Sequence, residues 1–116
     1  MFSPDGRYIP LSNQGRFKTG NQLRIVSLRE DMKGITVSGK IVRIGERKAI
    51  KTRYGESLLV PCAIEDETGR IALNLWGAQT VFAREGSMLK LYGCYVLSYN
   101  RELQLSIAKK GAIQIL

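Results

Sequence analysis

Apolar and polar residues alternate with a period of two along several segments of the chain, and this pattern is typical of half-buried β-strands. The alternation is cleanest over residues 70–76. One face of that segment carries Ile71, Leu73 and Leu75, and the other face carries Arg70, Ala72, Asn74 and Trp76. The pattern therefore predicts a strand that buries its aliphatic side chains and leaves the only tryptophan on the outer face.

Further strands are predicted at residues 35–44, 58–64, 88–99 and 102–107, with a short closing strand at 111–116 and a strand-like piece at 23–28. Residues 47–56 are predicted to form a basic hairpin with its turn at Gly55, and residues 66–69 a tight turn. Gly39 predicts a bulge or a bend inside its strand. Gly93 predicts a bulge, which would turn Cys94 and Val96 inward and leave Tyr95, Leu97 and Tyr99 outward.

The order of elements is three strands, a short helical connection at residues 77–84, and two strands. This order predicts an all-β, five-stranded OB-fold Greek-key barrel with a short helix between strands 3 and 4. An SH3-like barrel ranks second, because it usually lacks a helical element at that place. Residues 1–22 show no period and are expected to form an irregular or flexible basic N-terminal arm, bearing Arg7, Arg16 and Lys18. The OB-fold domain is expected to cover residues 23–116.

Composition narrows the function classes. The 116 residues fit one domain, and the chain contains neither an apolar run long enough to span a membrane nor a secretory signal pattern. It has no histidine, no nucleophile motif and no glycine-rich phosphate loop, so we expect neither an enzyme nor a cofactor. Cys62 and Cys94 are expected to be buried free thiols rather than metal ligands. The acidic residues 65–67 fit a hydrogen-bonded turn better than a metal site.

Charge and aromatic placement indicate a polyanionic partner. The net charge is +8, and the excess is densest around residues 40–53. The candidate phosphate-binding residues are Lys40, Arg43, Arg47, Lys48, Lys51 and Arg53. Trp76, Tyr95 and Tyr99 are predicted to share one outer face, where each would offer a base a stacking surface. Tyr54, Arg70, Asn74 and Gln104 are further candidates. The alternatives are a charged face that serves solubility and aromatic side chains that cap the ends of the barrel.

Several motifs resemble a known family. They are GKIV at residues 39–42, TRYG at 52–55, IEDETGRIALNLWG at 64–77, Gly86, and LQL at 103–105. Together they resemble the simple, one-OB-domain single-stranded DNA-binding proteins of archaea, which are similar to the DNA-binding domains of replication protein A. The resemblance covers about residues 24–111. It implies stacking by Trp76, Tyr95 and Tyr99, and phosphate contacts by Lys48, Lys51 and Arg53.

The leading hypothesis is a non-enzymatic protein that binds single-stranded DNA in replication, recombination or repair, with little sequence preference. Such a protein would lie with the DNA in the cytoplasm, or in the nucleus of a eukaryote, and other replication or repair proteins are candidate partners. The chain ends without the disordered tail that some relatives use to recruit partners, so we expect no recruitment through such a tail. One alternative is an RNA-binding OB domain. Another is a structural OB subunit of a larger complex like replication protein A.

Overall fold

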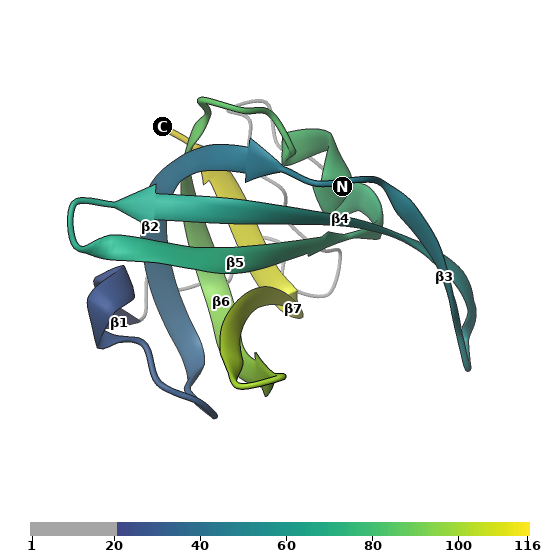
Figure 1. Cartoon of the computed structure of the whole chain (residues 1–116), viewed down its shortest axis with the longest axis horizontal. Coiled ribbons are helices and arrows are strands. Elements are labelled where there is room, and N and C mark those ends of the chain that lie inside the picture. Colours follow the sequence, from purple (N-terminus) through teal and green to yellow (C-terminus); the bar gives the residue numbers. More distant parts are fainter. Residues whose placement is uncertain (1–20) are drawn as a thin grey trace.

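The computed structural model describes residues 21–116. Its strands are β1 (Asn21–Gln22), β2 (Lys33–Ile44), β3 (Lys48–Thr52), β4 (Gly55–Asp66), β5 (Gly69–Trp76), β6 (Met88–Tyr99) and β7 (Glu102–Ile115). Two 3-10 turns interrupt them, η2 (Ile25–Ser27) before β2 and η3 (Gly77–Phe82) between β5 and β6. The strand order is β1-β2-β6-β7-β5-β4-β3, and a further pairing of β2 with β4 closes the barrel (Figure 1). The predicted all-β OB-fold is confirmed, with η3 as the helical connection.

Strand β2 belongs to both sides of the barrel. It pairs with β6 from Lys33 to Lys40 and with β4 from Lys40 to Ile44. Gly39 lies where the strand passes from one partner to the other, and a Cβ atom there would lie 2.7 Å from the carbonyl oxygen of Glu65. Only glycine permits so close an approach of two backbones. The register shifts of β2 lie on either side of Gly39, between Ile35 and Val37 and between Ile41 and Arg43, and Gly39 itself provides the close approach to β4 where the strand changes partner.

The bulge predicted at Gly93 is also present. The register between β6 and β7 shifts between Tyr92 and Cys94, and Gly93 has a φ of +69°. Beyond the bulge, Cys94 and Val96 are buried in the core. Tyr95, Leu97 and Tyr99 therefore point outward, because successive side chains of a strand alternate between its two faces.

The interior of the barrel is filled by aliphatic side chains from every strand of the closed ring, among them Ile41, Ile64, Leu73, Leu75, Leu91 and Leu105. Cys62 and Cys94 are buried free thiols, as predicted. Burial raises the pKa of Cys62 to about 11 and that of Cys94 to about 12, because a thiolate loses its hydration inside the protein.

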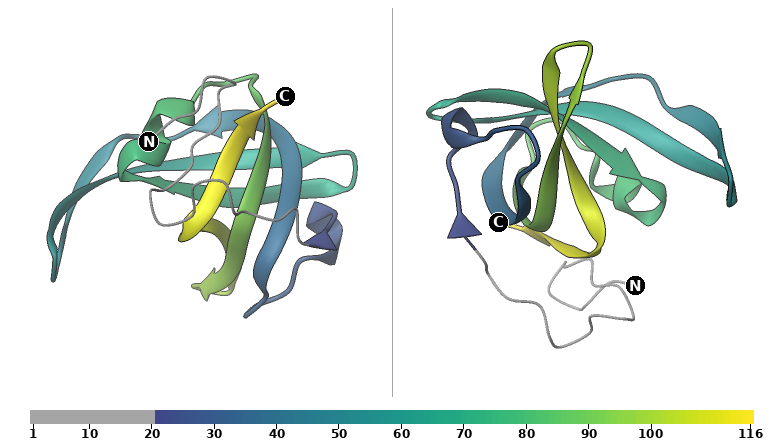
Figure 2. Two further views of the ribbon diagram at one scale, coloured as in Figure 1. Left: turned by 180° about the vertical axis from the view of Figure 1, so that it is seen from behind. Right: turned by 90° about the horizontal axis from the view of Figure 1, so that it is seen from below.

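The predicted basic hairpin is formed by β3 and the beginning of β4, which pair from Lys48–Leu59 to Thr52–Gly55. It extends beyond the barrel and curves away from it (Figures 1 and 2). Within residues 21–116, β4 is the only strand that pairs with β3, so one backbone edge of β3 has no partner strand. The hairpin is thus joined to the domain through β4 alone.

Two local expectations differ from the structure. The strand predicted at residues 23–28 is wrong: this segment contains the 3-10 turn η2, because its backbone amides are bonded to the turn between β4 and β5. The closing strand predicted at residues 111–116 is not separate, since β7 runs without interruption to Ile115. The predicted arm, residues 1–22, lies outside the described residues except for Asn21 and Gln22, which form β1. No helix in residues 21–116 is long and apolar enough to cross a membrane.

Candidate nucleic-acid interface

The side chains of β4, β5, β7 and β6 that point away from the core form one continuous surface, which we call the outer face. Strand register aligns its residues in rows. One row crosses the four strands in the order β4, β5, β7 and β6, and its residues are Pro61, Asn74, Ser106 and Tyr95. A second row runs through Ala63, Ala72, Gln104 and Leu97. Ala63, Ala72 and Ser106 are the small residues in these two rows, and Ser106 is buried beneath its neighbours.

A groove of about 810 Å³ lies at one end of the outer face. Trp76, Tyr95 and the hairpin residue Tyr54 all line it, together with Arg53 and Lys109. The Lys109 Nζ atom lies 5.9 Å from the centre of the Tyr54 ring, and the Arg53 Cζ atom lies 6.0 Å from it. We call these five residues the aromatic groove. It places three aromatic rings and two positive charges around one cleft, which Glu56 also lines with one negative charge.

Trp76 is held in place at the end of β5 by a buried glutamine. The backbone amide of Trp76 donates to Gln79 Oε1 at 3.0 Å, and Gln79 Nε2 donates to the carbonyl of Ile107 in β7 at 3.3 Å. Gln79 is buried, so these bonds are shielded from water. The backbone of Trp76 is thereby fixed relative to β7, while the half-buried indole stays on the outer face.

Tyr99 shares the outer face with Trp76 and Tyr95, as the sequence predicts, but it does not line the aromatic groove. It lies at the far end of β6, four residues and about 13 Å along the strand from Tyr95. Its side chain is 66% exposed, and Leu97 lies between the two tyrosines on the same face. The three aromatic side chains thus mark both ends of the face.

All six basic residues singled out from the sequence are exposed. Lys48, Lys51 and Arg53 belong to the hairpin, Lys40 and Arg43 to β2, and Arg47 to the link between β2 and β3. Arg43 lies opposite Ala63 and lines a second groove, of about 670 Å³, with Arg70. Lys109 was missed by sequence reasoning, because it follows the segment predicted as the fifth strand and only the curvature of the hairpin brings it to Tyr54.

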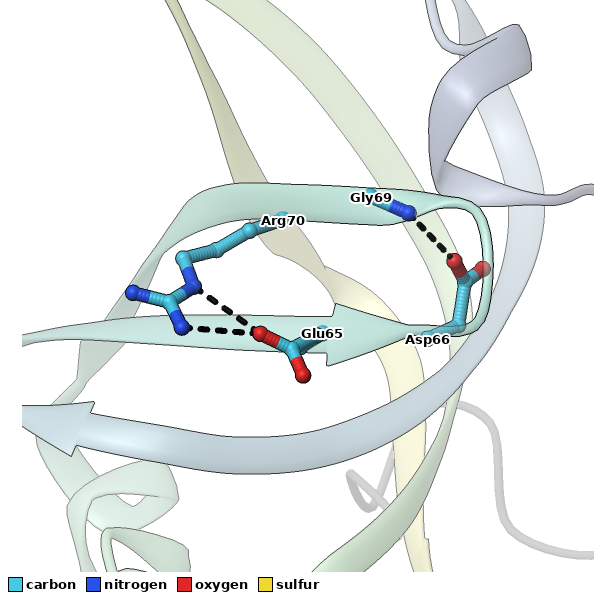
Figure 3. A network of polar contacts seen from close by, with 4 residues as sticks. All are labelled: Glu65, Asp66, Gly69 and Arg70. Atoms are coloured by element: carbon cyan, nitrogen blue, oxygen red, sulfur yellow. Dashed lines mark hydrogen bonds and ion pairs between the residues drawn. The ribbon is translucent and has the colours of Figure 1, made fainter.

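Two of the acidic residues 65–67, Glu65 and Asp66, bond to residues of the turn between β4 and β5 and of the start of β5 (Figure 3). Arg70 forms an ion pair with Glu65 at 2.8 Å, and both side chains are exposed. Asp66 accepts bonds from the amides of Ile25, Thr68 and Gly69. Partial burial raises the pKa of Asp66, but these bonds and one from the Thr68 hydroxyl outweigh it, so the pKa lies below its ordinary value. No group of three cysteine or carboxylate side chains that could hold a metal ion occurs in residues 21–116.

Asn74 and Gln104, also candidates from the sequence, form a pair near the middle of the outer face. Asn74 Nδ2 donates to Gln104 Oε1 at 2.9 Å, and both side chains are half-buried. The pair lies between the aromatic groove and the groove lined by Arg43. A ligand strand that ran from one groove to the other would cross it.

The chain is similar to a curated archaeal protein. It is 26% identical over 90 residues to the single-stranded DNA-binding protein Ssb of Saccharolobus solfataricus, and the match covers 78% of this chain. The chain spans about 61% of the length of that relative. No family model matches the chain.

Solved structures share the fold. The OB domain of Ta0387 from Thermoplasma acidophilum superposes with a TM-score of 0.74 at 22% identity, over 84% of this chain and 88% of that one. The second OB-fold domain of replication protein A from Methanococcus maripaludis has a TM-score of 0.68 at 22% identity, over 82% and 94% of the two chains. A replication protein A heterotrimer bound to single-stranded DNA has a TM-score of 0.71 at 20% identity, over 84% and 25%. The OB-fold and the resemblance to single-stranded DNA-binding proteins, both expected from the motifs, are confirmed.

Proposed function

We propose that this chain, an OB-fold domain similar to archaeal single-stranded DNA-binding proteins, binds single-stranded DNA largely independently of sequence. The aromatic groove carries the proposal: Tyr54, Trp76 and Tyr95 line one cleft together with Arg53 and Lys109. A folded protein keeps exposed aromatic surface of this kind for a reason, and flat bases beside a phosphate backbone match it. The likeness to an archaeal Ssb supports the same ligand.

Stacking supplies the part of the affinity that is independent of salt. A base stacked on an aromatic ring contributes about 1–3 kcal/mol, and every base has a flat face. We assign this role to Trp76, Tyr95 and Tyr99, with Tyr54 at the tip of the hairpin. Since Tyr99 lies beyond Leu97 at the other end of the outer face, the strand would run along the length of the face and not only through the groove.

Phosphate contacts supply the part that depends on salt. We assign them to Lys40, Arg43, Arg47, Lys48, Lys51 and Arg53, and we add Lys109. A single strand that contacts three or four of these cations should show a slope of log K against log salt of about −2 to −3. Binding of this kind serves replication, recombination or repair, at the sites where DNA is exposed as a single strand.

The fluorescence of Trp76 tests the proposal directly, because it is the only tryptophan. Adding an oligo-dT to the protein at low salt should quench its emission. Trp76→Ala should weaken binding, followed by anisotropy of a labelled oligomer, by about 1–3 kcal/mol while the salt slope stays nearly constant. Duplex DNA and an RNA of the same sequence serve as competitors. Unchanged fluorescence together with no gel shift at low salt would refute the proposal.

A further inference from the structure

We propose that Asn74 and Gln104 act as one reversible hydrogen-bonding unit, which binds the Watson–Crick edge of one base and accepts any of the four. This role rests on the proposed function. It concerns hydrogen bonds to the edge of a base and not stacking on its flat face. Such hydrogen bonds ordinarily create sequence preference, so their compatibility with all four bases needs an explanation.

The position of the pair suits this role. Asn74 is the next outward residue before Trp76 on β5, about 7 Å along the strand. Gln104 lies opposite Leu97 on β6, one row from Tyr95. Two neighbours on β5 and β7 are small: Ala72 lies beside Gln104, and the buried Ser106 lies beside Asn74. The larger neighbours are Pro61, opposite Asn74, and Leu97, opposite Gln104, and the edge of a base stacked on Trp76 or Tyr95 would reach the amides between them.

The chemistry follows from the single bond between the two amides. Each side chain has one carbonyl acceptor and one NH₂ donor group. The bond uses the NH₂ of Asn74 and the carbonyl of Gln104, which leaves Asn74 Oδ1 as an acceptor and Gln104 Nε2 as a donor. If both amides rotate by half a turn, Gln104 donates to Asn74 instead, and the remaining donor and acceptor exchange places. Either arrangement offers one donor beside one acceptor.

Every base matches one of the two arrangements. Thymine has N3–H beside O4, cytosine has N4–H₂ beside N3, adenine has N6–H₂ beside N1, and guanine has N1–H beside O6. The order of donor and acceptor differs among them, and the paired rotation of the amides supplies either order. The interface thus forms directional bonds to a base without choosing among the four.

Removing one donor group destroys this symmetry. In Asn74→Asp or Gln104→Glu, the carboxylate accepts the bond from one N–H of the remaining amide, and the two oxygens outside that bond are both acceptors where the wild-type pair offers one donor and one acceptor. Two acceptors fit guanine, which has N1–H and N2–H₂ side by side. They fit hypoxanthine less well, because it retains N1–H and O6 but lacks the 2-amino group. The wild-type pair needs only N1–H and O6, which both bases have.

The experiment compares two oligomers in lithium buffer, which suppresses quadruplexes: alternating dG and dT, and the same sequence with deoxyinosine in place of each dG. Anisotropy gives Kd for each. The wild-type protein should bind both within about twofold, whereas Asn74→Asp and Gln104→Glu should each prefer the dG oligomer by about fivefold or more. The uniform repulsion between the added charge and DNA cancels in this ratio.

Gln114→Glu is the matched control. Like Gln104→Glu, it replaces an amide by a carboxylate on strand β7. The new carboxylate can still accept the hydrogen bond from the Tyr92 hydroxyl. Its ratio should stay at the wild-type value. Thermal melts establish that each variant folds, and two independent variants guard against the loss of one. Ratios in both variants that equal the wild-type ratio would overturn the role of the pair, as would a strong wild-type preference for dG. A wild-type protein that binds neither these oligomers nor oligo-dT would refute the proposed function itself.

Discussion

Replacing Gly93 by alanine tests the reasoning that places Tyr95 and Tyr99 on the outer face. Two costs add. The residue has a φ of +69°, where an L side chain costs about 1–2 kcal/mol. A Cβ atom would also lie 2.8 Å from the Cα atom of Gly111, which is backbone and cannot rotate away. Overpacking of this kind costs about 1–3 kcal/mol, so Gly93→Ala should lower the free energy of unfolding by about 2–5 kcal/mol.

Gly34→Ala is the matched control for this prediction. Gly34 has a φ of +63°, and a Cβ atom there would meet no atom within 4 Å. The control therefore carries the backbone cost alone, about 1–2 kcal/mol. Both variants are unfolded with urea and followed by the fluorescence of Trp76. Gly93→Ala should be less stable than Gly34→Ala by about 1–3 kcal/mol.

DNA binding by the same variants distinguishes two outcomes of Gly93→Ala: a bulge that is kept under strain and a bulge that disappears. If the strand keeps its bulge, Gly93→Ala binds single-stranded DNA like the wild type below its melting range. If the bulge disappears, residues 94–99 turn over by one position, Tyr95 and Tyr99 point inward, and DNA binding weakens along with stability. Equal stability of the two alanine variants would show that the close contact with Gly111 costs nothing, and the argument for an obligatory glycine would fail.

Three further predictions concern charge and thiols. Asp66→Ala should lower the free energy of unfolding by about 1 kcal/mol at pH 7, since the carboxylate bonds backbone amides much as a helix cap does. The folded state depresses the pKa of Asp66, so this contribution is complete above the unfolded value of about 3.9 and is lost as the pH falls through the folded value; urea denaturation at pH 7 and pH 3 should show the gap between variant and wild type narrowing. Cys62 and Cys94 should react with a thiol reagent at pH 8 only after denaturant is added, because burial raises the pKa of both; rapid labelling of the native protein would contradict their burial. Arg53→Gln should reduce the slope of log K against log salt by about 0.7, as the loss of one phosphate contact requires, while the quenching of Trp76 by DNA persists; an unchanged slope would remove Arg53 from the interface.

Sequence reasoning worked where a feature depends on neighbouring residues. Strand alternation alone places Trp76 opposite the core stripe, since residues two apart share a face. The bulge could be placed because glycine is the residue that adopts a positive φ without strain, and Gly93 interrupts an otherwise regular strand. Those two positions determine which aromatic side chains face outward.

Features that depend on distant contacts could not be predicted in this way. Lys109 reaches Tyr54 across 55 positions, through the curvature of a hairpin whose shape no local pattern encodes. The segment at residues 23–28 resembles a strand in composition, but Asp66, 41 residues away, bonds the amide of Ile25 and fixes a 3-10 turn. The bond between Asn74 and Gln104 likewise appears only once β5 and β7 lie side by side.

One edge of β3 has no partner strand within residues 21–116, and this gives its lysines a second purpose. An exposed strand edge is a template on which another chain can add a strand, and charged side chains, lysine above all, prevent such pairing. Lys48 and Lys51 lie on this edge, at either side of Ile50. Substituting both lysines with uncharged residues to test their contacts with DNA would also leave a short apolar edge, to which a second molecule could add a strand. The same charges that would attract a nucleic acid would therefore also discourage two copies of this protein from pairing through β3 when none is bound.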